Sequence, residues 1–312
     1  MDIKKGILEG NILSAARMIS MIENDREEAA NIIKEIFPYT GNAYLIGVTG
    51  SPGVGKSTLV SQMIKIFRDR GKTVGVIAVD SSSPFSGGAL LGDRIRMQEH
   101  EMDPEGVFVR SMATRGNLGG LSKATRDAAY VMDAMGREII IIETVGVGQV
   151  ELDIVKTAYT TVVILAPGMG DTIQAMKAGI MEIGDIFIVN KADHEGVEET
   201  LRDVEYMLNM GADEREWHPD VYKTIAAKGE GVEDFIDGIE KHRKYLEDAD
   251  LKLQKVYGKE QLLDLLKERV ERRIMKDDKL GEEFVQEYVK KIIQREIDPY
   301  TVSEIMMNKI GL

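Results

Sequence analysis

The stretch Gly50-Ser-Pro-Gly-Val-Gly-Lys-Ser-Thr58 directly follows the apolar run 44–48 and matches the pattern G-x-x-x-x-G-K-[ST]. Glycines let such a loop curl so that successive backbone N–H groups point inward at an anion. The Lys reaches the outer phosphates, and the hydroxyl that follows it ligates magnesium. The stretch therefore predicts a phosphate-binding loop for a nucleoside triphosphate. The residues expected to line it are Gly50, Ser51, Pro52, Gly53, Val54, Gly55, Lys56, Ser57 and Thr58.

The size and charge of the chain restrict its function classes. With 312 residues it has room for one large α/β domain with helical extensions, or for two modest domains. A formal net charge of −13 argues against a general nucleic-acid-binding protein, whose affinity comes largely from Lys and Arg. No apolar run approaches the roughly 20 residues of a membrane span, and the N-terminus lacks the apolar core of a signal peptide. We therefore expect a cytoplasmic protein that binds neither nucleic acid nor membrane.

The chain has no cysteine, which excludes disulfides and thiolate metal sites. Four histidines are scattered along it: His100, His194, His218 and His242. Because they do not cluster in the sequence, we interpret them as surface residues or hydrogen-bonded core residues rather than as a metal site.

From Tyr44 to about Tyr245, short β-rich apolar runs alternate with helical segments. The predicted strands are 44–49, 74–79, 107–109, 139–143, 161–166, 185–189 and 221–226. This alternation predicts an α/β fold with a mostly parallel sheet and helices on both faces. Ligands of such sheets bind at the carboxyl ends of the strands, and each motif described below follows one of these runs.

Both ends of the chain show helical periodicity. Residues 3–37 predict a helical hairpin ending at Pro38, within an N-terminal helical extension over 1–42. The sheet domain then spans 43–248. In the remaining part, 249–312, amphipathic helices replace the strands, and Pro299 closes the second of them. We interpret this part as a dimerisation arm, with packing on the chain's own core as the alternative.

Two motifs point to guanine. Asn190-Lys-Ala-Asp193 follows a predicted strand and resembles the N-K-x-D motif of GTPases, although alone it is also typical of a strand-to-helix turn. In GTPases the aspartate accepts hydrogen bonds from the ring N1–H and exocyclic amine of guanine, which adenine cannot supply. Thr224-Ile-Ala-Ala-Lys-Gly229 resembles the last GTPase motif. The predicted ligands are therefore GTP and GDP. The residues expected to hold the base are Asn190, Lys191, Asp193, Ala226, Ala227 and Lys228.

Glu143-Thr-Val-Gly146 ends another predicted strand at the position of the D-x-x-G switch motif, with Glu in place of Asp. A carboxylate there orients magnesium-bound water, and the N–H of Gly146 is placed to sense the γ-phosphate. The next residue is Val147, not the water-positioning Gln of Ras-like enzymes, and Gln149 is out of register. We therefore expect water activation to come from elsewhere and intrinsic turnover to be slow.

A loop rich in Gly and Ser runs from Asp80 to Asp93 after a further predicted strand. Because Mg²⁺ prefers carboxylate, water and phosphate oxygens, these two carboxylates are expected to help hold it, with helix or turn capping as the alternative. The predicted magnesium ligands are Ser57, Asp80, Asp93 and Glu143, and the predicted catalytic residues are Lys56, Asp80, Asp93 and Glu143. Weaker candidates for stabilising phosphate charge are Arg94, Arg96 and Arg115.

Several stretches together resemble one family. They are D-S-S-S-P-F-S-G-G-A-L-L-G-D-R-I-R-M from Asp80, E-T-V-G-V-G-Q from Glu143, A-P-G-M-G-D from Ala166, and N-K-A-D from Asn190. The terminal D-P-Y-T from Asp298 is similar too, so the resemblance covers nearly the whole chain. The family is the ArgK/MeaB family of SIMIBI-class P-loop GTPases, the methylmalonyl-CoA mutase-associated GTPases.

The resemblance implies a homodimeric G protein that chaperones an adenosylcobalamin-dependent acyl-CoA mutase, gating cofactor loading and protecting the mutase from inactivation. It also implies that Pro167-Gly-Met-Gly-Asp171 and Lys177 form a switch that reports nucleotide state to the mutase. Two other functions stay open. One is a small-molecule kinase or ATPase linked to amino-acid transport, although no segment supplies an evident acceptor site. The other is a nickel-type metallochaperone GTPase, which the absence of cysteine disfavours.

Overall fold

The computed structural model divides into two compact units, Met1–Asp248 and Ala249–Leu312, which are described separately. It describes all residues except 1, 25–26, 81–102, 104, 114–117, 145–156, 169–179, 211–215, 249–261, 264, 268, 272, 275–280 and 311–312. Within the described part of the chain, no helix combines the length and apolarity needed to cross a membrane.

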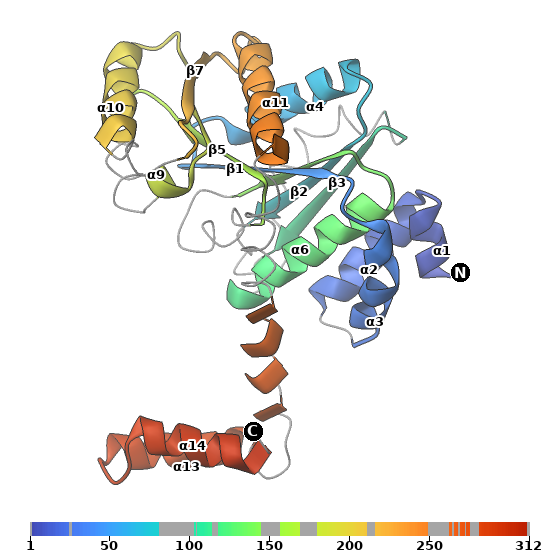
Figure 1. Cartoon of the computed structure of the whole chain (residues 1–312), viewed down its shortest axis with the longest axis vertical. Helices are drawn as coiled ribbons and strands as arrows, with labels where there is room; N and C mark the ends of the chain where they lie inside the picture. Colours follow the sequence, from blue (N-terminus) through green and yellow to red (C-terminus); the bar gives the residue numbers. More distant parts are fainter. Residues whose placement is uncertain are drawn as a thin grey trace. The chain divides into compact units, whose positions relative to one another are not determined.

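A parallel sheet forms the centre of the first unit (Figure 1). Its strands are β1 (Tyr44–Gly50), β2 (Val74–Asp80), β3 (Val107–Ala113), β4 (Ile139–Glu143), β5 (Thr160–Leu165), β6 (Ile186–Asn190) and β7 (Asp220–Thr224). Their order across the sheet is β3-β2-β4-β1-β5-β6-β7, and each neighbouring pair is parallel. The predicted α/β fold with a parallel sheet is confirmed.

Helices cover both faces of this sheet, which explains why β4 and β5 are buried at every residue. On one face, α4 (Lys56–Asp69) and α11 (Val232–Asp248) pack against residues such as Ile46 and Ile141. On the other face, α6 (Leu118–Ala134) packs against residues such as Ile140. On that same face, α9 (Ile180–Ile183) and α10 (Val197–Met210) cover the part formed by β5 and β6.

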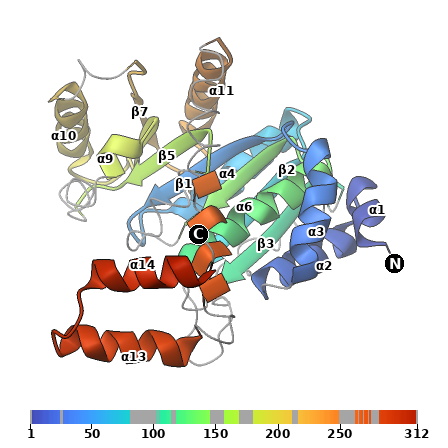
Figure 2. The same ribbon diagram turned by 60° about the horizontal axis from the view of Figure 1, so that its bottom comes forward.

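Three helices precede β1, where the sequence predicted a hairpin of two. They are α1 (Ile3–Leu8), α2 (Ile12–Glu23) and α3 (Glu27–Ile36), followed by the 3₁₀ helix η1 (Phe37–Tyr39). The additional break falls at Gly10, whose φ of 75° lies in the left-handed region, and at Asn11, whose side chain accepts from the N–H of Ser14 at 2.9 Å. The apolar sides of these helices join α6 and the sheet in one buried cluster. Figure 2 shows the three helices beside α6.

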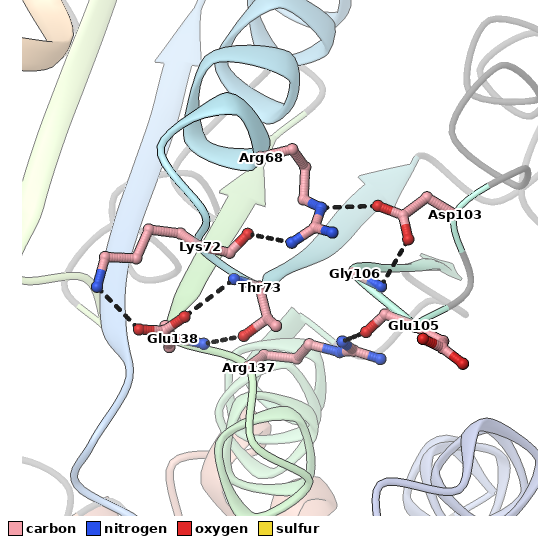
Figure 3. A network of polar contacts seen from close by, with 8 residues as sticks. All are labelled: Arg68, Lys72, Thr73, Asp103, Glu105, Gly106, Arg137 and Glu138. Carbon is pink, nitrogen blue, oxygen red and sulfur yellow. Dashed lines mark hydrogen bonds and ion pairs between the residues drawn. The ribbon is translucent and has the colours of Figure 1, made fainter.

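A polar network ties together the amino ends of β2, β3 and β4 (Figure 3). Arg68 donates from Nε to Asp103 at 2.7 Å and from Nη1 to the carbonyl of Lys72 at 2.8 Å. The hydrogen bond from Arg68 holds the pKa of Asp103 below its usual range. A Cβ on Gly106 would lie 2.0 Å from Cζ of Arg68, so the guanidinium packs directly on a glycine backbone. These contacts hold together the amino ends of the three strands, which lie at the end of the sheet away from the predicted site.

The second unit is helical throughout its described residues between 262 and 274, in α13 (Glu282–Ile293) and in α14 (Pro299–Ile310). Pro299 does not simply close a helix, as predicted, but begins α14. Asp298 supplies the cap, because its Oδ1 accepts from the N–H groups of Tyr300 at 2.9 Å and Thr301 at 3.0 Å. The first position of a helix suits proline because the N–H that it lacks has no helical partner there.

Candidate nucleotide-binding site

The predicted phosphate-binding loop joins the carboxyl end of β1 to the start of α4. Gly50, Gly53 and Gly55 have φ values of 145°, 83° and 101°, which favour glycine. A Cβ on Gly50 would lie 2.2 Å from the carbonyl oxygen of Ile164, and one on Gly55 would lie 2.4 Å from Nδ2 of Asn190. The motif glycines are therefore needed both for the backbone turn and for its close approach to β5 and Asn190.

The first residues of α4 contact both the loop and the neighbouring strand β4. The buried Lys56 donates from Nζ to the carbonyls of Gly50 at 2.7 Å and Ser51 at 3.1 Å. Ser57 donates from Oγ to Oε1 of Glu143 at 2.6 Å. Glu143 is the last residue of β4, pairs in register with Val48 of β1, and is only 4% exposed. The structure thus brings together two of the predicted magnesium ligands, Ser57 and Glu143.

The donor chemistry at this point fits Mg²⁺, because a hydroxyl oxygen and a carboxylate oxygen lie in direct contact. Asp80 ends β2, and Ala78 of the same strand pairs with Glu143, so the carboxyl ends of β2 and β4 are adjacent. Among the residues that the structure describes, no cluster of three or more His, Asp or Glu side chains is placed to hold a metal ion. The side chain of Asp80 and the whole of Asp93 are not among the described residues.

Asn190, the last residue of β6, links the phosphate loop to the loop after β7. Its buried side chain donates from Nδ2 to the carbonyl of Val54 at 2.7 Å. Its Oδ1 accepts from Thr224 Oγ1 and from the N–H of Ala226, each at 3.0 Å. Sequence reasoning assigned Asn190 to the ligand and gave Thr224 no contact with it. The sequence held one sign of this contact, because Thr224, the first residue of the last GTPase motif, carries a hydroxyl group that can bond to Asn190.

The remaining base-motif residues lie around this link. Lys191 has a φ of 58° and donates from Nζ to the carbonyl of Gly53 at 2.8 Å. Oδ2 of Asp193 lies 3.6 Å from Nζ of Lys228, and the Asp193 side chain is 41% exposed. Ala227 is exposed in the same loop. The two predicted base-binding segments therefore meet beside the phosphate loop, with the aspartate carboxylate open to a ligand.

Other predicted site residues lie outside the described part of the chain. These are Asp93, Arg94, Arg96, Arg115, Gly146, Val147, Gln149, Met169, Gly170, Asp171 and Lys177. Their proposed roles stay predictions.

The histidines do not contribute to this site where they are described. His194 and His218 are exposed, whereas His242 is buried and its Nδ1 lies 2.8 Å from Oγ1 of Thr160. Burial lowers the pKa of His242 to about 4, so this imidazole is neutral at neutral pH. The interpretation of His242 as a hydrogen-bonded core residue is confirmed, and His100 lies outside the described residues.

A cavity of about 540 Å³ lies at the opposite edge of the sheet, between the turn that joins α1 to α2 and the loops before β2, β3 and β4. Its walls include Asn11, Thr73, Glu105 and Arg137. Because it lies at the amino ends of the strands, it is separate from the phosphate loop and from both base-binding segments.

Comparison with known proteins finds relatives of this chain. The family model described as methylmalonyl-CoA mutase-associated GTPase MeaB matches residues 15–281. A protein of Pyrococcus abyssi named as a GTPase is 47% identical over 307 residues, which cover 97% of this chain and 94% of that protein. The GTPase ArgK of Escherichia coli is 32% identical over 288 residues, which cover 90% of this chain and 86% of ArgK.

A solved structure shows the same fold. The crystal structure of an LAO/AO transport system kinase covers 100% of this chain and 97% of its own, with a TM-score of 0.71 and 22% sequence identity. The family resemblance seen in the sequence motifs is confirmed by the family match and by the sequence relatives. The chain is therefore a GTPase and belongs to the MeaB family of methylmalonyl-CoA mutase-associated GTPases.

Proposed function

We propose that this GTPase is a chaperone of an adenosylcobalamin-dependent acyl-CoA mutase of the methylmalonyl-CoA mutase type, gating cofactor loading and protecting the mutase from inactivation. The name of its family, which couples a GTPase to that mutase, supports the choice of partner. The observation that best supports a nucleotide-dependent switch is the 2.6 Å hydrogen bond between Ser57 and Glu143. It joins the end of the phosphate loop to the first residue of the switch motif. A change at the γ-phosphate therefore reaches the switch segment directly.

The site residues divide into three tasks. Lys56 neutralises the outer phosphates, exchanging its loop carbonyl partners for phosphate oxygens. Ser57, Asp80, Asp93 and Glu143 hold Mg²⁺, which when bound offsets the charge that develops on the transferring phosphate. Asp193 reads the guanine edge. These roles are part of the proposal.

The chain lacks a Ras-type Gln after Gly146, so another group must position the attacking water. We assign this to ordering of the segments 80–94, 143–149 and 167–177 by the bound mutase. Mutase binding and nucleotide binding then act on one conformational equilibrium, so each changes the affinity of the other by the same factor. The hydrolysis rate rises with the population of the ordered form.

The partner assignment predicts that affinity for the cognate mutase depends on the bound nucleotide. The dissociation constant of the complex should differ about fivefold or more between a non-hydrolysable GTP analogue and GDP, the usual range of coupling between two sites. Isothermal titration of the purified apo-mutase against each nucleotide-loaded form measures it. Identical affinities in both states would contradict the proposal. Transfer of labelled γ-phosphate to an amino acid instead of water would favour the kinase alternative.

We also propose that the second unit makes a homodimer. Large apolar side chains are exposed along its helices: Leu262, Leu263, Leu265, Leu266, Val289, Ile293, Tyr300 and Met307. Apolar surface of this kind on a helical unit marks an interaction site. A second copy is the occupant that the family resemblance implies.

The homodimer proposal is tested by placing two charges on this surface. Leu262 and Leu266 are 58% and 49% exposed and lie one helical turn apart on the same face. Leu262→Lys with Leu266→Lys should convert the dimer to a monomer in light scattering, because two ammonium groups cannot be buried in an apolar interface. Leu13→Lys, at an exposed leucine of the first unit, is the control and should stay dimeric. A monomeric native protein, or a double variant that stays dimeric, contradicts the assignment.

A further inference from the structure

One ion pair lies partly buried at the border of the apolar layer between the N-terminal helices and the sheet. Arg110 of β3 lies on the same strand face as Phe108 and Met112, which are both buried in that layer. From Nη2 it donates to the carboxylate of Glu23 and, at 3.0 Å, to Oγ of Ser20, both on α2. The side chains of Glu23 and Arg110 are only 8% and 25% exposed.

Stability alone does not account for charges at this position. Removing two ionised groups from water costs free energy that their attraction offsets only with good geometry and complete hydrogen bonding. The Nε–H of Arg110 is buried and, within the described part of the chain, has no hydrogen-bond partner. Apolar residues in such a layer would be neutral or stabilising by comparison. An ion pair is directional, whereas the hydrophobic effect is not, so this pair can fix how α2 lies on β3.

The position of β3 affects the predicted site because β3 is hydrogen-bonded to β2, which ends at Asp80. β3 is an edge strand in the described sheet and pairs with β2 alone. Arg110 pairs with Ile77, and further along the same strands Ala113 pairs with Asp80. At about 3.3 Å per residue, the ion pair therefore lies about 10 Å from the strand end that carries Asp80. Figure 2 shows α2 next to β3, in agreement with the contacts of Arg110.

We propose that Glu23 and Arg110 are positioning residues for GTP hydrolysis. Their ion pair fixes β3, and through it the carboxyl end of β2 that carries Asp80, next to the end of β4 that carries Glu143. Neither Glu23 nor Arg110 is proposed to contact the nucleotide. The inference rests on the proposed role of Asp80 as a magnesium ligand. It assigns the N-terminal helices a part in the chemistry that their sequence does not indicate.

The test separates position from stability with three variants. Arg110→Met leaves the Glu23 carboxylate buried without its guanidinium and should lower both the melting temperature and kcat. Glu23→Met with Arg110→Met should regain a near-native melting temperature, because an apolar pair suits the layer. Its kcat should nevertheless stay about three- to thirtyfold low, with a higher magnesium concentration at half-maximal rate and unchanged GDP affinity. Arg68→Met, which breaks the pair with Asp103 before the amino end of β3, far from Asp80, should lower the melting temperature only.

Two results would overturn the inference. One is a double variant with native kcat and native magnesium dependence. The other is a loss of kcat in Arg68→Met equal to that in Arg110→Met, because activity would then follow stability alone. The double variant keeps the test valid where Arg110→Met is too unstable to purify. Asp80→Asn separates the two proposals: unchanged magnesium dependence in that variant refutes the role of Asp80 itself, whereas a shifted dependence beside a native double variant refutes only the positioning role.

Discussion

Glu143→Ala is expected to slow GTP hydrolysis about 10²- to 10³-fold while GDP affinity changes little, an effect similar to losing one preorganised group at a transition state. The carboxylate is buried at the end of β4 and accepts a hydrogen bond from Ser57, so it is held beside the phosphate loop. A group that organises metal and water acts mainly in the transition state, and its loss lowers kcat more than binding. Single-turnover hydrolysis and GDP titration measure the two effects separately.

Two further variants show whether the charge of Glu143 matters and whether its loss acts on hydrolysis or on binding. Glu143→Gln keeps the shape and the acceptor oxygen but removes the charge, so it should remain slow if the charge is what matters. Lys56→Ala should instead lose nucleotide binding, because the ammonium meets phosphate in the ground state and in the transition state alike. Hydrolysis at the native rate by Glu143→Ala would show that its proposed role is wrong.

Asp193→Asn should weaken GTP binding about 10- to 100-fold and improve binding of xanthosine triphosphate. A hydrogen bond to a charged group contributes about 1.5–3 kcal/mol, and the amide presents a donor where xanthine carries an oxygen. The side chain is 41% exposed and lies 3.6 Å from Lys228, so the substitution should leave the fold intact. Fluorescent-nucleotide competition with GTP, ATP and xanthosine triphosphate measures the change.

The control for this switch is Asp203→Asn, at an exposed position on α10, which should leave all three affinities unchanged. Equal affinity of the native protein for ATP and GTP would refute guanine reading by Asp193. So would an Asp193→Asn protein that gains no affinity for xanthosine triphosphate.

The fold was predictable because its signals are local. Alternating apolar runs and helical segments indicate the strands, and strand ends of a parallel sheet gather at one edge. That rule also brings Ser57 and Glu143 together, since the phosphate loop before Ser57 follows β1 and Glu143 ends the neighbouring strand β4. The prediction of two N-terminal helices was wrong, although the region is helical. The break at Gly10 and Asn11 interrupts an otherwise continuous helical periodicity and makes a third helix.

Contacts between distant segments were not predictable in the same way. The link at Asn190 joins Val54, Thr224 and Ala226, which the sheet order alone brings together. The ion pair between Glu23 and Arg110 spans 87 residues, and Arg110 lies beyond the predicted end of its strand at 109. The pair of Glu23 and Arg110 leaves no motif in the sequence, and the motifs that contain Asn190 and Thr224 do not indicate that these two side chains contact each other. Both contacts depend on which elements become neighbours in the fold.

The central claim, a GTPase coupled to a cobalamin-dependent mutase, is tested most directly by the hydrolysis rate at increasing mutase concentration. Steady-state phosphate release by the purified protein is measured alone and with the cognate mutase up to saturation. The account predicts a saturable rise of about tenfold or more, because the partner supplies the ordering that a Ras-type Gln would otherwise provide. An unchanged rate at saturating mutase, with equal mutase affinity in the GTP and GDP states, would contradict it.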